Sequence, residues 1–166
     1  MGKTLIVNGS PRQNGYCAKV CQYIADKTGG VIIDCEVGHC TGCDACRDGN
    51  CIIDDKMQTY YDLIKKADNI ILVSPLYFSM LTGKMLTFAS RWQYFYHNPI
   101  KGEKHGTVIL LGGGSTKDTS KAFSTAKIIL KYAGIQTPET IAFVGTDEKD
   151  PMRDEGFLQS VNDAVL

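Results

Sequence analysis

The chain has 166 residues, in which 18 lysines and arginines balance 18 aspartates and glutamates. This balance leaves no long-range field that would attract nucleic acid or an anionic membrane, and no stretch is apolar for long enough to span a bilayer. The length fits one domain, and we expect a cytoplasmic protein in which the seven cysteines stay reduced.

Apolar, β-branched runs alternate with stretches of helical periodicity along the chain. In chain order we expect a strand over 3–8, a helix that ends at Gly29-Gly30, a strand over 31–35, a helix over about 57–66, a strand over 69–74, a long helix over about 82–96, a strand over 107–111, a helix over about 117–132, a strand over about 140–144 and a last helix from 154 onward. Strands separated by helical crossovers predict one parallel sheet with helices on both faces.

Five strands with right-handed crossovers favour an α/β fold of the flavodoxin-like kind. This is a three-layer sandwich whose five-stranded parallel sheet has the order 2-1-3-4-5. We expect residues 1–166 to form a single domain, with a cysteine-rich loop at about 36–56. Ligands of such folds bind beyond the carboxyl ends of the strands, where the strand order reverses. The loops after the first, third and fourth strands are therefore the expected binding loops.

These three loops have distinctive compositions. The loop over 9–16 combines small residues and one arginine with the start of a helix, an arrangement suited to a single phosphate. The 74–78 loop offers a proline and two aromatics, and the 112–114 glycines let backbone approach a ligand closely. Each loop alone also fits a plainer alternative, namely an ordinary turn, core aromatics or a mobile glycine turn. Their coincidence at one edge favours a flat, phosphorylated ligand.

Together these loops resemble those of the NADPH-dependent FMN reductase-like branch of the flavodoxin-like flavoproteins. The resemblance rests on GSPRQNG at 9–15, SPLYF at 74–78, and Gly83 and Arg91 downstream. It implies FMN as cofactor, NAD(P)H as electron donor, and a small-molecule or protein redox partner. The implied FMN-binding residues are Ser10, Arg12, Asn14, Gly15, Tyr16 and Cys17 at the phosphate, Pro75, Leu76, Tyr77 and Phe78 along the ribityl chain and ring, and Gly112, Gly113, Gly114 and Ser115 near the far edge of the ring.

The sequence departs from this family's pattern in two places. Tyr16 and Cys17 stand where small polar residues are usual, and a thiol is a poorer phosphate donor than a hydroxyl. A thiol at a helix start, such as that of Cys17, can also have a lowered pKa. Ser90-Arg91 stands where the family has an Asp-Arg pair.

Four of the seven cysteines, Cys40, Cys43, Cys46 and Cys51, have the spacing C-x2-C-x2-C-x4-C. The first three match the compact run that wraps one face of an iron–sulfur cluster, and the fourth can reach the remaining iron. The loop also resembles that of the iron–sulfur flavoproteins, which carry a 4Fe–4S cluster beside FMN. Unmetallated thiols, zinc and redox-sensing disulfides remain alternatives. We expect the four cysteines to lie together, on the same side of the sheet as the flavin.

These observations predict an FMN-dependent redox flavoprotein, with a 4Fe–4S cluster as the candidate second cofactor. The alternatives are a cluster-free NAD(P)H-dependent FMN or quinone reductase and a non-enzymatic flavin- or metal-binding redox sensor. Because the flavin carries the chemistry, no catalytic side chain is expected. The helical stripe of Phe88, Trp92 and Phe95 is expected in the core, and the dense aromatics around it predict a homodimer or homotetramer.

Overall fold

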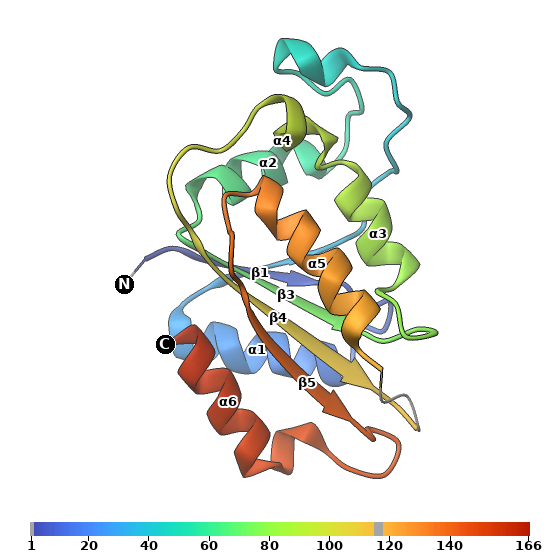
Figure 1. Ribbon diagram of the computed structural model, residues 1–166, viewed down its shortest axis with the longest axis vertical. Coiled ribbons are helices and arrows are strands. Elements are labelled where there is room, and N and C mark those ends of the chain that lie inside the picture. Colours follow the sequence, from blue (N-terminus) through green and yellow to red (C-terminus); the bar gives the residue numbers. More distant parts are fainter. Residues whose placement is uncertain (1, 115–117) are drawn as a thin grey trace.

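The computed structural model describes residues 2–114 and 118–166 as a five-stranded parallel sheet between two layers of helices (Figure 1). The strands are β1 (Thr4–Asn8), β2 (Val31–Asp34), β3 (Asn69–Pro75), β4 (His105–Gly112) and β5 (Glu139–Val144), in the order β2-β1-β3-β4-β5. The α-helices are α1 (Tyr16–Thr28), α2 (Met57–Lys66), α3 (Gly83–Ser90), α4 (Gln93–His97), α5 (Ser120–Tyr132) and α6 (Glu155–Val165), with short 3-10 helices η1 (Ala45–Asp48) and η2 (Pro151–Arg153). The predicted fold and strand order are confirmed. None of the described helices is long and apolar enough to cross a membrane.

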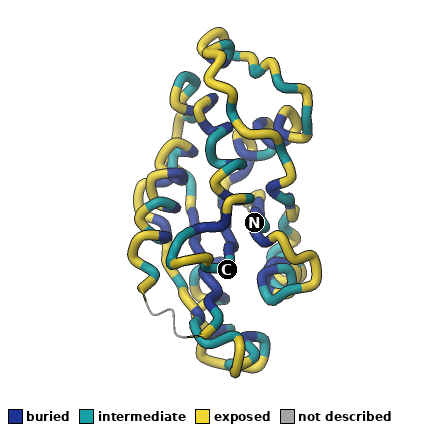
Figure 2. The backbone as a smooth tube through the Cα atoms, turned by 90° about the vertical axis from the view of Figure 1, so that its right-hand side faces the viewer, coloured by how far each residue is buried: buried dark blue, intermediate teal, exposed yellow. Residues whose placement is uncertain are grey.

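The three central strands are buried on both faces, as their uninterrupted apolar runs predict. Successive side chains point to opposite faces. Ile70 and Leu72 therefore pack into the core beneath α2, α3 and α5, whereas Ile71 and Val73 pack into the core beneath α1 and α6. Figure 2 shows this buried centre, with a largely exposed loop at one end of the molecule. The sheet is thus a rigid platform from which the binding loops leave.

The prediction of one long helix over 82–96 is wrong, because the helix breaks between α3 and α4. The backbone N–H groups of Arg91 and Trp92 donate three residues back, to Phe88 O at 3.1 Å and Ala89 O at 2.9 Å. The Tyr61 hydroxyl donates to the Arg91 carbonyl at 3.1 Å, and the Arg91 side chain is buried against the cysteine loop. These tertiary contacts replace the regular helical turn. The predicted stripe of Phe88, Trp92 and Phe95 is buried on both sides of the break.

One hydroxyl ties α3 to the loop after β1. The Thr82 Oγ1 accepts the Met85 N–H at 3.1 Å and caps α3, and it donates to the Gly9 carbonyl at 2.6 Å. Both bonds are buried. Thr82 therefore fixes the position where the chain leaves β1, which is the start of the predicted phosphate loop.

Candidate functional site

A cavity of about 350 Å³ lies at the carboxyl edge of the sheet, beyond the ends of β1, β3, β4 and β5. In Figure 1 these strand ends point to the lower right. The cavity is lined by Ser10, Arg12, Asn14, Gly15, Tyr16, Cys17, Lys19, Pro75, Leu76, Tyr77, Leu111, Gly113, Thr146 and Asp147. Residues from four loops thus meet at the edge where ligands of this fold bind.

One end of this cavity is built for an anion. Helix α1 starts there, and no side chain in the described ranges caps its N-terminus, so the first-turn N–H groups are free to bind a ligand. The Ser10 hydroxyl instead shapes the turn: it accepts the Arg12 N–H at 3.1 Å and donates to the Arg12 carbonyl at 3.3 Å. The side chains of Arg12 and Lys19 add two positive charges to the lining. Helix end and cations together suit a phosphate.

The apolar part of the lining consists of Pro75, Leu76, Tyr77 and Leu111. Close packing explains the glycines of the β4 turn. A Cβ at position 113 would stand 2.7 Å from a carboxylate oxygen of Asp147, and one at position 112 would stand 3.2 Å from Leu76 Cδ1. Glycine therefore allows the 146–147 loop to approach the end of β4. Apolar residues of this kind are suited to line the ring of a ligand.

The cysteine-rich loop leaves β2, and its short helix η1 packs against α4, at the top of Figure 1. Cys40, Cys43, Cys46 and Cys51 all line one small cavity of about 20 Å³. All seven cysteines of the chain are free thiols. Burial raises the pKa of the Cys46 thiol, and the nearby Cys40, Cys51 and Cys43 raise it further. All four cysteines of the motif therefore line the same cavity.

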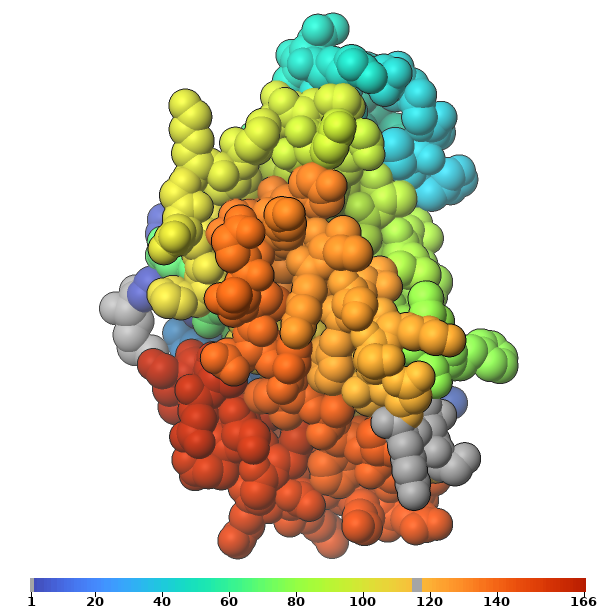
Figure 3. Space-filling view, viewed as in Figure 1, coloured from blue at the N-terminus to red at the C-terminus, as the bar shows by residue number. Residues whose placement is uncertain are grey.

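The cysteine cavity is separate from the cavity at the sheet edge, since the two share no lining residue. The cysteines therefore do not line the predicted flavin cavity, and their placement on the same side of the sheet as the flavin stays a prediction. After leaving β2 at the carboxyl edge, the loop turns over the helical layer, where Tyr61, Arg91 and Tyr94 line its cavity. In the space-filling view the loop forms the tip of the molecule (Figure 3).

The four thiols suit an iron–sulfur cluster in kind and number. Within residues 2–114 and 118–166, however, no three His, Cys, Asp or Glu side chains stand close enough to hold a metal ion. Cys43 is exposed, whereas Cys46 is buried. The donor set fits a cluster, and the sulfurs would have to move closer together to bind one.

The sequence profile of the family described as NADPH-dependent FMN reductase matches residues 3–149. The chain belongs to this family. It is 29% identical over 121 residues to an iron–sulfur flavoprotein from Archaeoglobus fulgidus, an alignment that covers 67% of this chain and 55% of that protein. It is 25% identical to an NADPH azoreductase from a Bacillus species, over 98% of this chain and 88% of that protein. The chain thus spans only about half the length of the iron–sulfur relative.

A solved structure shows the same fold over the whole chain. The Trp repressor binding protein from Bacillus subtilis superposes with a TM-score of 0.72 at 15% identity, covering 99% of this chain and 98% of that one. These comparisons confirm the family resemblance found in the sequence.

Most of the residues predicted to bind FMN line the carboxyl-edge cavity of this FMN reductase family member. They are Ser10, Arg12, Asn14, Gly15, Tyr16, Cys17, Pro75, Leu76, Tyr77 and Gly113. Gly112, Gly114 and Phe78 are not among its lining residues, and Ser115 lies outside the described residues. The Phe78 side chain is 99% exposed, on a two-residue hairpin turn that Tyr77 and Met80 close.

The sequence reasoning missed Lys19, Leu111, Thr146 and Asp147. Thr146 and Asp147 follow β5, and the rule that ligands bind beyond strand ends applies to that strand as well. Lys19 lies one helical turn after Tyr16, and its Nζ stands 5.1 Å from the centre of the Tyr16 ring. A lysine one turn after the start of a helix is the sequence signal that predicts a second cation at the phosphate site.

The expectation of a lowered Cys17 pKa is wrong. Burial raises the pKa of this thiol to about 12, despite an opposing backbone hydrogen bond. Desolvation of the thiolate outweighs the helix N-terminus because the side chain is almost fully enclosed. Cys17 thus lines the cavity as a neutral thiol. Cys35 is buried at the end of β2, as expected of a small hydrophobic residue.

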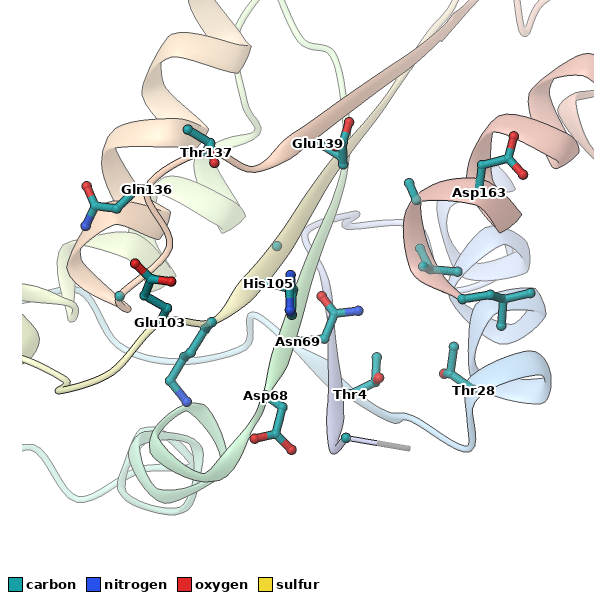
Figure 4. A pocket seen from close by; sticks show the side chains of 17 residues that line it. Thr4, Thr28, Asp68, Asn69, Glu103, His105, Gln136, Thr137, Glu139 and Asp163 are labelled. Carbon is teal, nitrogen blue, oxygen red and sulfur yellow. The ribbon is translucent and has the colours of Figure 1, made fainter.

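A second large cavity, of about 620 Å³, lies at the opposite, amino edge of the sheet (Figure 4). Asn69 and His105 stand at the starts of β3 and β4 there, and the carboxylates of Asp68, Glu103, Glu139 and Asp163 surround them. None of the predicted FMN or cysteine residues lines it. It lies away from the edge where this family's fold binds its ligands.

Proposed function

We propose that the protein is an FMN-dependent oxidoreductase that takes electrons from NAD(P)H. The observation that carries this proposal is the lining of the carboxyl-edge cavity, which combines two cations and an uncapped helix N-terminus with the apolar residues Pro75, Leu76, Tyr77 and Leu111. FMN combines a phosphate with a planar ring, so it matches both the charged and the apolar residues of this lining. Family membership supports the same cofactor.

The chain's own residues have binding and orienting roles in this proposal. Arg12, Lys19 and the α1 N-terminus hold the phosphate, and Pro75 to Tyr77 set the position of the ring. Bound FMN supplies the redox chemistry. The raised pKa keeps the Cys17 thiol protonated, so Cys17 lines the cavity as a neutral group and does not act as a nucleophile.

Anaerobic reduction of FMN-loaded protein tests this function. Addition of NADPH or NADH should bleach the flavin absorbance with one flavin per chain. The Arg12→Ala variant should need a higher FMN concentration to show the same bleaching. Protein that binds FMN and is reduced by dithionite, but by neither nicotinamide, would contradict the proposed electron donor.

We further propose that Cys40, Cys43, Cys46 and Cys51 bind a 4Fe–4S cluster. Two observations favour it over the cluster-free alternative: all four line one cavity, and the buried Arg91 donates a hydrogen bond to the Cys51 sulfur at 3.3 Å. Three further relatives of 34–36% identity, over 43–52% of this chain, also have the name iron–sulfur flavoprotein. The names of these relatives and the thiol cavity of this chain thus support the same group.

Iron and acid-labile sulfide measured in anaerobically purified protein test the cluster. We expect both, and we expect Cys43→Ala to remove both while FMN stays bound. Cys35→Ala is the matched control, because it removes a thiol that lies outside the cysteine cavity. If reconstituted wild-type protein carries FMN but neither iron nor sulfide, the cluster-free reductase is the correct function.

We also propose a cytoplasmic homodimer or homotetramer. Reduced thiols support the compartment. Large exposed hydrophobic residues support assembly: Leu86 on α3, Tyr96 on α4, and Ile128 and Tyr132 on α5, with the Tyr96 and Tyr132 rings 5.8 Å apart. Light scattering coupled to gel filtration tests the assembly, and a mass of 18.2 kDa at micromolar concentration would contradict it.

A further inference from the structure

Asp147 is the one acidic residue among the described residues that line the carboxyl-edge cavity. It belongs to the turn after β5. None of the ion pairs within residues 2–114 and 118–166 involves Asp147, although Arg12 and Lys19 line the same cavity. A carboxylate repels a phosphate, so Asp147 is suited to a different part of a ligand that binds here.

Backbone hydrogen bonds fix the turn that carries Asp147 to the end of β4. The N–H groups of Gly145 and Thr146 both donate to the Gly112 carbonyl, at 2.8 Å and 3.0 Å. On the other side of Asp147, the Glu148 N–H donates to the Gly145 carbonyl at 3.0 Å. These bonds hold the backbone at position 147 in one place relative to β4.

The Asp147 carboxylate lies beside the apolar part of the lining. A Cβ at position 113 would stand 2.7 Å and 2.9 Å from its two oxygens, so both oxygens lie close to the Gly113 backbone. The preceding residue, Gly112, approaches Leu76 in the same way, and the Leu76 N–H donates to the Leu111 carbonyl at 2.8 Å. Leu76 and Leu111 both line the cavity. A charged acceptor therefore stands next to the residues suited to a ligand's ring.

The chemistry of a carboxylate limits what it can bind on a flavin. An ionised carboxylate only accepts hydrogen bonds. The carbonyl oxygens and bare nitrogens of an oxidised flavin ring also accept, and the ring's single donor is the imide N3–H. A carboxylate beside the ring can therefore pair with N3–H and with no other group of the ring.

We propose that Asp147 is a specificity-determining residue that accepts a hydrogen bond from the N3–H of the flavin ring. The inference rests on the proposed FMN site and names the residue that recognises the imide edge of the ring. A phosphate held by Arg12 and Lys19 leaves the ring free to turn over at the end of the ribityl chain. A second contact of opposite charge fixes which edge of the ring faces the turn after β5.

An analogue methylated at N3 tests this contact by binding alone. FMN and 3-methyl-FMN are titrated separately into wild type and variants, with flavin fluorescence as the signal. Wild type should bind 3-methyl-FMN about 10-fold more weakly than FMN. This is the lower end for a hydrogen bond to a charged group, because Asp147 is exposed and salt screens its charge.

The variants separate the carboxylate from its surroundings. Asp147→Ala should bind FMN more weakly than wild type does, and it should bind the two flavins about equally, since N3–H has lost its partner. Asp147→Asn keeps an acceptor without the charge, so its preference for FMN should be intermediate. Glu148→Ala is the matched control: Glu148 belongs to the same turn but does not line the cavity, and the wild-type preference should remain.

Wild type that binds FMN and 3-methyl-FMN equally would overturn the role of Asp147 and leave the FMN proposal standing. The same holds if Asp147→Ala binds FMN more tightly than wild type does, or if Glu148→Ala loses the preference. A preference that persists in Asp147→Ala while its FMN affinity falls would also overturn the role, because the carboxylate would then hold a ribityl hydroxyl. Wild type that binds neither flavin would overturn both proposals, so the FMN titration of wild type tells the two failures apart.

Discussion

Replacing Thr82 by valine tests how the phosphate loop is held in place. Valine has the shape of threonine without the hydroxyl, so it removes the cap on Met85 N–H and the bond to the Gly9 carbonyl. Loss of a cap costs about 1 kcal/mol. A buried carbonyl left without its donor costs about 1–2 kcal/mol more. We therefore expect the free energy of unfolding to fall by about 2–3 kcal/mol.

Urea unfolding of the FMN-free protein measures this change, with fluorescence of the single tryptophan, the buried Trp92, as the signal. Thr82→Ser should retain most of the stability because it keeps the hydroxyl. Thr125→Val is the matched control: its hydroxyl bonds only the Lys121 carbonyl on an exposed helix face, so we expect a change within about 0.5 kcal/mol. A loss below about 0.5 kcal/mol for Thr82→Val would refute the reasoning.

Three further changes follow from the same structure. Arg12→Ala should weaken FMN binding about 10-fold. This is the lower end for a charged hydrogen bond, because the Arg12 side chain is exposed and salt screens its charge. Fluorescence titration at two salt concentrations measures the change in affinity. Phe78→Asn with Ser79→Gly should stabilise the FMN-free protein by about 1 kcal/mol in urea unfolding, since both residues have positive φ, 54° and 61°. Burial opposes ionisation of Asp55, but hydrogen bonds from Arg91 and two backbone N–H groups outweigh burial and lower the Asp55 pKa. The ionised Asp55 therefore stabilises the fold above about pH 4, and this contribution is lost below that pH. Asp55→Asn should lose less stability than wild type between pH 5 and pH 3 in urea unfolding.

Each of these has a clear contrary outcome. Unchanged FMN affinity in Arg12→Ala at low salt would remove Arg12 from the phosphate site. A less stable hairpin variant would mean that the exposed Phe78 makes stabilising contacts. An acid loss in Asp55→Asn as steep as that of wild type would show that the Arg91–Asp55 pair does not contribute to the pH dependence.

The strands and the phosphate loop could be predicted because their signals are local. Leu5 to Val7 form an apolar run, and the turn that follows has the composition of an anion site. Gly29, which the sequence placed at the end of a helix, has the left-handed conformation (φ 66°) and caps α1 with a bond to Ala25 O. Here local sequence and tertiary structure agree.

The helix break and the position of the cysteine loop could not be predicted in the same way. Both depend on Arg91, whose partners at 38, 51, 53 and 55 are 36 or more residues away along the chain. Helical periodicity over 82–96 contains no sign of such contacts. The spacing of the cysteines predicts that they gather. Their position over α2 and α4 depends on the hydrogen bonds of the buried Arg91 guanidinium.

The central claim is that the carboxyl-edge cavity binds FMN by its phosphate, and comparison of FMN with riboflavin tests it most directly. Riboflavin has the same ring and ribityl chain without the phosphate. We predict one FMN per chain and at least about 10-fold weaker binding of riboflavin, because Arg12, Lys19 and the α1 N-terminus lose their ligand. Equal affinity for the two flavins, measured by fluorescence titration of wild-type protein, would contradict the account.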